Sequence, residues 1–453
     1  MTTQGKVITL DVTDLAFDGK AVAHLDGKVV FLKGGLPGET VEAEIVSSKP
    51  RYDQGVVRRI IKKSDQRIEP RCGHFGQCGG CTWQDLSYEQ QLTFKKKQVQ
   101  DCLKRLGGLE QVEVKEVLGV DDPFWYRNKM EFSFHEGIDQ PMVLGLHERG
   151  HFDRIFDLDK CWLQSELSNE IVAWVRQFVT THDIPAYNVG THTGYMRFLM
   201  IRQTARTDQV MVNLVTNRGL FPSAEAMVAG MTERFGQVTT IVHNQTGKVS
   251  NVAVGEVEEV LYGPGFIEEQ LFDRRFRIRA NSFFQTNSLQ AQKLYGAAFE
   301  MLQSEPTDRV LDLYCGAGTI GILLADKVES VGGVELVDDA VAAARENAAL
   351  NGIANISFHQ GRVRDYLKGQ RGCDSEFSTL IIDPPRAGLH PKAARRIIEM
   401  QPTKLLYISC NPATFARDAK VFALAGYHLP TVQPVDMFPH TMHIELVGRF
   451  YRN

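Results

Sequence analysis

The first sixty residues alternate apolar and polar side chains at the two-residue period of half-buried strands. Runs such as KVITLDV, TVEAEIV and GVVRRII are separated by turns that contain Gly or Pro. Asp26-Gly27 divides AVAHL from KVVFL in the manner of a tight hairpin. Five short strands in this length suit a small barrel of the OB type. The pattern therefore predicts a β-barrel domain over residues 1–62.

The pattern becomes mixed between residues 63 and 270. Residues 63–90 are rich in Gly and Cys and poor in apolar side chains, whereas residues 88–106 have a helical pattern that ends at Gly107-Gly108. Hairpin-like stretches such as KMEFSFHE and MRFLMIRQT follow. We predict a mixed α+β central domain over residues 63–270, with the helix at 88–106 packed on the C-terminal domain.

Strand and helix patterns alternate from residue 271 to the end. VLDLYC is a short apolar strand that leads through a glycine turn into the apolar helix TIGILLADK. VGGVEL, STLIIDPP and KLLYISCNP are further strands, and DDAVAAARENAAL has a helical pattern. This alternation predicts a doubly wound parallel α/β domain over residues 271–453, which binds its ligands at the carboxyl ends of the strands.

Length and composition are those of a globular protein. A chain of 453 residues with 43% hydrophobic and 23% charged residues fits two to four domains and excludes a disordered or fibrous protein. No apolar run approaches the ~18 residues of a membrane span, and the N-terminus lacks the apolar stretch of a secretory signal. We expect a cytoplasmic protein without a membrane partner.

The distribution of charge is more informative than its sum of −4. Residues 49–71 carry eight Lys or Arg against three acidic residues, and residues 95–97 and 274–279 form two more basic clusters. Basic patches on a mildly acidic body predict a surface that holds phosphate groups. Ordinary solvated surface charge is the alternative for each cluster.

The glycine turn after VLDLYC predicts a nucleoside site. Gly316 and Gly318 permit a tight turn and a close approach of a ligand to the backbone, and Glu335 ends the next strand. A carboxylate at that place suits the hydroxyls of a ribose. NAD and S-adenosylmethionine both fit this geometry. Asp383-Pro384, where the fourth strand ends, is more typical of methyltransferases than of dehydrogenases.

Two residues near the C-terminus are candidates for catalysis. Cys410 ends an apolar strand at the edge where the cofactor is expected, so its thiol is placed for nucleophilic attack. A small buried hydrophobe is the alternative, and it is the role that we assign to Cys102, Cys315 and Cys373. Glu445 begins the last apolar strand and suits a general base, with a structural ion pair as the alternative.

Cysteines are concentrated in one short segment. The chain has eight cysteines, too few for a disulfide scaffold, and three of them, Cys72, Cys78 and Cys81, lie within ten residues. Clustered thiols in a reducing compartment indicate a metal site.

Taken together, these motifs resemble the S-adenosylmethionine-dependent RNA 5-methyluridine methyltransferases. The resemblance covers nearly the whole chain, from an N-terminal barrel of the TRAM type through the cysteine segment to the C-terminal end. It rests on GKAVAHLDGKVVFLKGGLPGETVEAEI, CGHFGQCGGCTW, YRNKMEF, ANSFFQTN, DLYCGAGT, IIDPPRAG, YISCNP and HTMHIE. The last four motifs are highly specific in this order and spacing.

The resemblance implies a covalent mechanism. The thiolate of Cys410 adds to C6 of uracil, C5 then takes the methyl group, and Glu445 removes the C5 proton before the thiolate leaves. The motifs carry over the cofactor contacts of the family to four residues, with Thr319 as a weaker fifth candidate: Gln285, Tyr314, Glu335 and Asp383.

The resemblance also implies an iron–sulfur cluster and an RNA substrate. Cys72, Cys78, Cys81 and Cys161 match the ligands of a [4Fe–4S] cluster, with zinc as the alternative. We expect an aromatic residue such as Phe284 to stack on the target base once that base has left the stacked RNA. The barrel and the cluster favour 23S rRNA over tRNA as substrate, and no obligate protein partner is evident.

Three other functions are compatible with parts of the sequence. An amino-group methyltransferase shares Asp383-Pro384-Pro385, but it needs an aromatic residue where this chain has Arg386. A radical S-adenosylmethionine methylthiotransferase combines a cluster with a TRAM domain, but its cysteine spacing is Cys-x3-Cys-x2-Cys. A non-catalytic RNA-binding protein has no need of Cys410.

Overall fold

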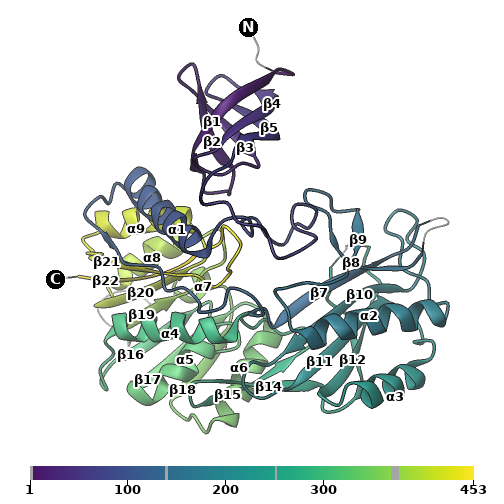
Figure 1. Ribbon diagram of the computed structural model, residues 1–453. Coiled ribbons are helices and arrows are strands. Elements are labelled where there is room, and N and C mark those ends of the chain that lie inside the picture. Colours follow the sequence, from purple (N-terminus) through teal and green to yellow (C-terminus); the bar gives the residue numbers. More distant parts are fainter. Residues whose placement is uncertain (1–3, 138–140, 250–251, 369–376, 453) are drawn as a thin grey trace.

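The fold was examined in a computed structural model that describes residues 4–137, 141–249, 252–368 and 377–452. A small barrel, a seven-stranded sheet and an eight-stranded sheet form three parts (Figure 1), in agreement with the predicted fold class. Cys373, predicted to be a buried hydrophobe, lies outside the described residues. No described helix has the length and apolarity needed to cross a bilayer, and the cytoplasmic location stays a prediction.

The N-terminal barrel is closed and has the five strands that the alternating pattern predicts. Asp26 (φ 48°) and Gly27 (φ 78°) both have left-handed backbones, which is the two-residue turn that matches the twist of a hairpin. Its core also includes Trp83 and Leu86, which follow the barrel in the chain. The strands, in spatial order, are β1 (Val7–Leu15), β2 (Ala21–Leu25), β3 (Lys28–Lys33), β5 (Tyr52–Lys62) and β4 (Thr40–Ser48).

The central sheet has seven strands and a core that is filled from one face by two helices, α2 (Glu166–Thr181) and α3 (Ala224–Arg234). Strands β11 and β12 are parallel because α3 crosses between them, and the other pairs are antiparallel. The spatial order is β13 (Val257–Tyr262), β12 (Val238–Thr246), β11 (Val210–Asn217), β10 (Met196–Gln203), β7 (Lys129–His135), β8 (Val143–His147) and β9 (Ile155–Asp157).

The C-terminal sheet is doubly wound, although it is not wholly parallel. Strand β22 runs antiparallel to both of its neighbours, and the connections reverse direction between β16 and β19, which lie side by side. A ligand crevice is expected at this point. The spatial order is β18 (Ile356–Gln360), β17 (Ser330–Glu335), β16 (Arg309–Leu313), β19 (Thr379–Ile382), β20 (Lys404–Ser409), β22 (Glu445–Tyr451), β21 (Thr431–Val435) and β6 (Glu113–Val114).

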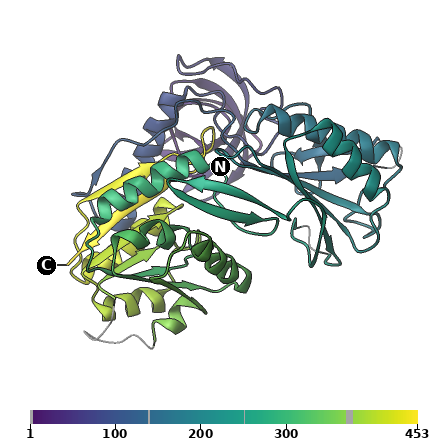
Figure 2. The ribbon, with the colours of Figure 1, turned by 90° about the horizontal axis from the view of Figure 1, so that it is seen from below.

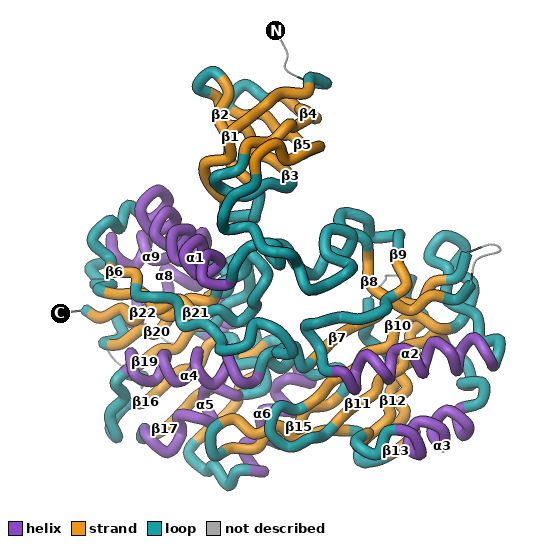
Figure 3. The backbone as a smooth tube through the Cα atoms, in the orientation of Figure 1, coloured by secondary structure: helices purple, strands orange, loops and turns teal. Residues whose placement is uncertain are grey.

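Helices cover both faces of this sheet, as Figure 3 shows. Figure 2 shows the molecule from below, with the two large sheets on opposite sides. A two-stranded ribbon of β14 (Phe266–Leu271) and β15 (Arg274–Arg279) packs with α4 in the core of the C-terminal domain. The helices are α4 (Ser288–Leu302), α5 (Thr319–Leu324), α6 (Asp338–Leu350), α7 (Val363–Tyr366), α8 (Pro391–Met400) and α9 (Pro412–Leu424), with a 3₁₀ turn at Ala325–Lys327.

The predicted helix at 88–106 is present and packs on the C-terminal domain. Helix α1 (Tyr88–Cys102) continues as a π-helical turn (Leu103–Gly107) and ends at Gly108, whose left-handed backbone (φ 66°) matches the expected glycine stop. Val99 and Cys102 lie in one core cluster with Phe415 and Phe422 of α9.

Carboxylates pair with the basic clusters at 95–97 and 274–279, but in the described part of the chain no salt bridge involves five members of the cluster at 49–71: Lys49, Arg51, Lys62, Lys63 and Arg71. The structure therefore gives no support to a phosphate-binding role for the clusters at 95–97 and 274–279, and that role stays a prediction for residues 49–71. Lys95 is fully buried and faces the protein interior. Most other members pair with carboxylates on the same surface: Lys96–Glu116, Lys97–Asp14, Arg58–Glu44, Arg59–Glu42, Arg67–Glu39, Arg274–Asp326, Arg277–Glu268 and Arg279–Glu346. Basic residues that are close together in the sequence face carboxylates from other elements in the fold. Composition alone does not reveal these partners.

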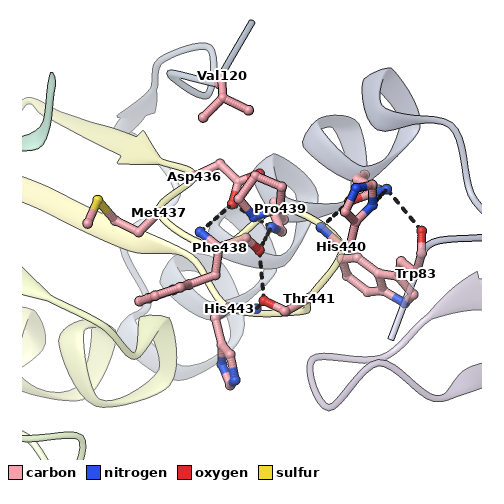
Figure 4. Close-up of polar contacts among 12 residues, drawn as sticks. Trp83, Val120, Asp436, Met437, Phe438, Pro439, His440, Thr441 and His443 are labelled. Carbon is pink, nitrogen blue, oxygen red and sulfur yellow. Dashed lines mark hydrogen bonds and ion pairs between the residues drawn. The ribbon is translucent and has the colours of Figure 1, made fainter. Parts of the chain in front are cut away.

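Lys95 joins α1 to the segment that precedes β22, in which Figure 4 labels Asp436 and Phe438. Its Nζ lies 2.6 Å from Asp436 Oδ1 and 3.1 Å from the carbonyl oxygen of Phe438, and both charged side chains are 0% exposed. Tyr88 donates to the other oxygen of Asp436 at 3.0 Å. Burial lowers the pKa of Lys95, and the attraction of Asp436 opposes this shift. A buried pair of this kind fixes the loop only while both charges are present.

Replacing Lys95 with Met is expected to lower the free energy of unfolding of the C-terminal part by about 3 kcal/mol or more, because Asp436 is left buried without its cation. Urea denaturation followed by circular dichroism measures the change. Lys96→Met is the matched control, since Lys96 pairs with the exposed Glu116 and its loss is expected to change stability by less than about 1 kcal/mol. Equal effects of the two substitutions would contradict this assignment.

Candidate active site

One large cavity lies at the carboxyl edge of the C-terminal sheet. Its volume is about 1730 Å³, which exceeds the ~300–1000 Å³ that holds one small ligand. The cavity has room for a nucleoside cofactor and for a nucleotide base. All six residues predicted for catalysis and cofactor binding line it: Gln285, Tyr314, Glu335, Asp383, Cys410 and Glu445.

Glu335 is held at the end of β17 by backbone donors. Its Oε2 accepts from the amide of Gly316 at 3.2 Å, and its Oε1 accepts from Leu336 and Val337 at 2.7 and 2.9 Å. The carboxylate thus ties the glycine turn to the next strand. Tyr314 begins this turn with a left-handed backbone (φ 66°), a conformation that few bulky residues adopt.

Gly318 is required by close packing as well as by backbone conformation. Its φ is 76°, and an added Cβ would lie 2.8 Å from the ring of Phe358 and 3.0 Å from Ala344. Asp312 of β16 accepts from the amide of Gly321 in α5 at 3.2 Å. Burial together with Asp383 raises the pKa of Asp312 to about 8. The glycine motif therefore serves helix–strand packing and also shapes the cavity.

Gln285 belongs to a loop that is fixed by Asn287. The Asn287 side chain caps α4 by accepting from Gln290 and donates to the carbonyl of Met437 at 3.0 Å. In this loop Phe284 is 7% exposed and packs in the core, whereas Phe283 is 75% exposed, and both residues line the cavity. The stacking of Phe284 on the target base stays a prediction. Phe283 presents the more exposed ring.

Cys410 follows β20, and the turn after it is locked in two places. Asn411 caps α9 by accepting from Ala413 at 3.0 Å, and its Nδ2 donates to the carbonyl of Arg386 at 3.0 Å. This second bond ties the Cys410 turn to the loop that carries Asp383. Cys410 is half-buried. Cys102 and Cys315 are buried, as predicted for the two of them.

The cavity is a region of low polarity that contains several carboxyl groups. Burial and the neighbouring Asp383 raise the pKa of Glu445 to about 8, and burial raises the pKa of Asp383 to about 7. The pKa of Cys410 is raised to about 11 by burial and by Glu445 and Asp383, against an opposing effect of Arg386. At neutral pH a thiol with this pKa is protonated, and a carboxyl with a pKa of about 8 is about one tenth ionised.

The loop at residues 436–443 contributes groups that the sequence does not single out. His443 lines the cavity and lies with Nδ1 2.7 Å from a terminal nitrogen of Arg386, and burial with that guanidinium lowers the pKa of His443 to about 4. Neutral imidazole thus accepts from Arg386. Tyr295 of α4 is also at the cavity wall, although its buried place in a helix pattern gives no signal of function.

The same loop also contacts the barrel and the cysteine segment. The carbonyl of His440 accepts from the amides of Thr82 and Trp83 at 2.7 and 3.0 Å, and its ring Nδ1 lies 3.1 Å from Gln91 Nε2. Figure 4 shows His440 close to Trp83. A Cβ on Gly19, in the turn between β1 and β2, would lie 3.4 Å from the sulfur of Met442. Segments of all three parts of the molecule therefore meet at one edge of the cavity.

The four cysteines of the predicted cluster line a second cavity, of about 400 Å³. Gln84 donates to the sulfur of Cys81 and accepts from the amide of Cys72, and Gly80 donates to the sulfur of Cys78. Cys161 is held at its backbone by Asn169. In the described part of the chain, no three cysteine, histidine or carboxylate groups are close enough to hold a single metal ion.

The two cavities share a wall. Gly79, Gly80, Arg127 and Thr286 line both of them, and Thr286 is the neighbour of Gln285. The sequence gives no hint of this proximity, because Cys161 and Thr286 are far from the first three cysteines along the chain.

Comparisons with known families agree with these features. The family described as tRNA (uracil-5-)-methyltransferase matches residues 87–451, and the TRAM domain matches residues 1–57. An uncharacterised RNA methyltransferase of Chlorobaculum tepidum is 40% identical and aligns with 99% of this chain and 97% of its own. Another, from Caldanaerobacter subterraneus, is 36% identical over 98% of each chain.

Among solved structures, the chain is similar to the Pyrococcus abyssi tRNA (uracil-54, C5)-methyltransferase in complex with S-adenosyl-L-homocysteine. The TM-score is 0.79 at 31% identity, with 98% of this chain and 100% of that chain covered. The family match spans more than half of the chain, and the Chlorobaculum relative spans nearly all of it. The chain therefore belongs to the S-adenosylmethionine-dependent RNA uracil-5 methyltransferases that carry an N-terminal TRAM domain.

Proposed function

We propose that Cys410 and Glu445 carry out the methylation of a uridine in RNA, and that S-adenosylmethionine contacts Gln285, Tyr314, Glu335 and Asp383. The observation that supports this proposal is that all six side chains line one cavity. Glu335, at the end of β17, is placed for the ribose hydroxyls. S-adenosylmethionine supplies the methyl group on a sulfonium sulfur.

Cys410 activates the base by covalent addition. Its thiolate forms a bond to C6 of uracil, and the electrons of the C5–C6 double bond move into an enolate that ends at O4. C5 then attacks the methyl carbon, and the electron pair of the broken bond stays on the sulfur that leaves. The proton of the Cys410 thiol must reach solvent first, and Arg386 favours this step because its charge lowers the thiol pKa.

Glu445 completes the reaction as a general base. Its carboxylate takes the proton from C5, the C5–C6 double bond re-forms, and the Cys410 thiolate is expelled. Burial suits Glu445 to this task because it raises the pKa of the carboxyl to about 8 and makes the carboxylate a stronger base.

Replacing Glu445 with Gln is expected to stop the reaction after methyl transfer, because no group removes the C5 proton. The protein then accumulates as an adduct with RNA that resists denaturation, seen as a shifted band on a denaturing gel. Cys410→Ala is expected to give no adduct and no methylation while binding S-adenosylmethionine as the wild type does. Full methylation by Cys410→Ala would overturn the covalent mechanism, and a Glu445→Gln protein without adduct would remove Glu445 as the base.

The rate is expected to rise with pH. Both reacting groups are acids with raised pKa values, about 8 for Glu445 and about 11 for Cys410, and each acts in its deprotonated form. As pH increases from 6 to 9 the active fraction of each group grows, so kcat/KM increases, less steeply above pH 8 where more than half of Glu445 is ionised. Steady-state kinetics across this range measure it. A flat or falling profile would contradict the assignment.

We further propose that Cys72, Cys78, Cys81 and Cys161 hold a [4Fe–4S] cluster. All four side chains line one small cavity, and backbone and amide donors are aimed at two of the sulfurs. Zinc bound by the same four thiolates is the alternative. The cluster would connect the segment at 63–90 to the central sheet, and methyl transfer requires no electron from it.

Protein purified without oxygen is expected to be brown and to contain iron. Cys72→Ala is expected to lose the iron and to unfold at a lower temperature, because the cysteine segment has little apolar core of its own. Iron analysis, visible absorption and thermal melting measure these changes. Cys102→Ala is the control, since Cys102 lies in the core beside α9 and its loss leaves iron in place. Iron-free and fully active wild-type protein, or zinc in place of iron, would overturn the cluster.

We take 23S rRNA as the first candidate substrate and tRNA as the second. The reason for rRNA is the barrel together with the cysteine segment, but the Pyrococcus abyssi tRNA enzyme is matched over its whole chain, which weakens the argument from the barrel and favours tRNA as the alternative. Mass spectrometry of nucleosides from rRNA and tRNA of a deletion strain distinguishes them. The RNA that loses 5-methyluridine, and regains it with wild-type protein but not with Cys410→Ala, is the substrate.

A further inference from the structure

A cationic and aromatic cluster lies on the surface beside the cysteine cavity. The guanidinium of Arg71 lies 3.8 Å from the ring centre of Trp162, 5.0 Å from that of Phe124 and 5.6 Å from that of Trp125. The ammonium of Lys160 lies 4.2 Å from the Trp162 ring. These five residues are called the Arg71 cluster below. Arg71 itself is exposed, and the other four are half-buried.

The aromatic part of the cluster is fixed by the backbone. The amide of Trp125 donates to the carbonyl of Trp162 at 3.0 Å, and the two indole rings are 5.0 Å apart between centres. Trp125 has a left-handed backbone (φ 56°), which is rare for a bulky side chain and is found mainly where function demands it. The rings therefore form a rigid surface that needs little reordering to accept a ligand.

Arg71 differs from the paired arginines of this protein. Within the described residues, no carboxylate or carbonyl pairs with its guanidinium, which is exposed and lies over the Trp162 ring. In the same part of the chain, Lys160 forms a salt bridge with the exposed Glu166 alone. An exposed guanidinium over an aromatic ring, with no acidic partner, suits a phosphate at its edge and a base on its outer face.

The cluster adjoins the catalytic cavity. The ring of Phe124 packs on His440 with 4.6 Å between centres, and the next residue, Thr441, lines the cavity. Arg71 directly precedes Cys72 in the chain, and Trp162 directly follows Cys161. Both cysteines are predicted ligands of the iron–sulfur cluster. The Arg71 cluster is therefore linked to the wall of the catalytic cavity through the packed rings of Phe124 and His440.

We propose that the Arg71 cluster binds an unpaired nucleotide of the RNA that flanks the methylated uridine. Its base stacks on the cluster, and its phosphate pairs with Arg71 and Lys160. The proposal rests on the proposed function, because it assumes an RNA substrate with its uridine in the catalytic cavity. It assigns to this surface the task of holding the strand open next to the target.

Two substitutions separate stacking from charge. Trp162→Ala is expected to weaken binding of a fluorescein-labelled oligouridine of about 12 nucleotides by roughly 10-fold, while Trp162→Phe retains most of the affinity because a ring remains. Arg71→Gln is expected to weaken binding and to reduce the slope of log K against log salt by about 0.7, the contribution of one phosphate contact to a single strand. Trp162→Ala leaves that slope unchanged. Fluorescence anisotropy measures both.

Three controls accompany the binding measurements. Arg105→Gln removes an exposed arginine at the end of α1, away from the cluster, and is expected to leave affinity unchanged. Iron content and S-adenosylmethionine affinity of each variant report on an intact cysteine cavity and an intact catalytic cavity. With the substrate RNA, the variants are expected to raise KM and leave kcat near the wild-type value.

Each outcome decides between distinct conclusions. If Trp162→Ala and Arg71→Gln bind RNA as the wild type does, the nucleotide site is wrong while the methylation proposal stands. If affinity falls only together with iron, and falls equally in Trp162→Phe, the cluster has a structural role and the proposal is overturned. If the wild type binds no RNA at all, the proposed function fails and the nucleotide site fails with it.

Discussion

The ion pair between Lys95 and Asp436 is the constraint on which the catalytic edge depends. Both side chains are completely buried, so neither charge is stable in this place without the other. Because Lys95 belongs to α1 and Asp436 begins the loop before β22, the pair fixes the position of that loop relative to the rest of the molecule. His443 and Glu445 lie further along the same segment and line the cavity. The buried pair therefore anchors the segment that carries the Glu445 carboxylate.

The topology of the sheet explains why so many titratable groups meet in one apolar place. Tyr314 and Asp383 follow two strands that lie side by side at the point where the connections reverse direction, and Cys410 follows the next strand in the sheet. Burial then raises the pKa values of Asp312, Asp383 and Glu445, since each charged form loses water. The same low polarity that keeps Cys410 protonated in the free protein strengthens Glu445 as a base. The order of the strands therefore determines both which groups meet in the cavity and the burial that shifts their pKa values.

Periodicity and local motifs predict much of this molecule, and long-range partners set the limit. The two-residue alternation predicts the barrel, and the glycine turn with Glu335 predicts the strand–turn–helix unit, because both depend on neighbours in the chain. Lys95 looks like one of three surface lysines until Asp436, more than three hundred residues away, is placed beside it. Phe283 and Phe284 are adjacent, and only the packing of α4 decides which ring is buried. The lack of an acidic partner for Arg71 in the described part of the chain is likewise invisible in the sequence, because the carboxylates that pair with other arginines, such as Arg58 and Arg59, come from other strands.

The core of the barrel includes residues beyond its last strand, which ends at Lys62. Trp83, from the cysteine segment, is part of its interior, and the turn at Gly19 lies against Met442 at the mouth of the catalytic cavity. Truncation after β5 would therefore leave an indole in water on one fragment and an open seam on the other. The N-terminal barrel therefore cannot be exchanged freely for another domain. A replacement would have to cover the Trp83 side chain as this barrel does.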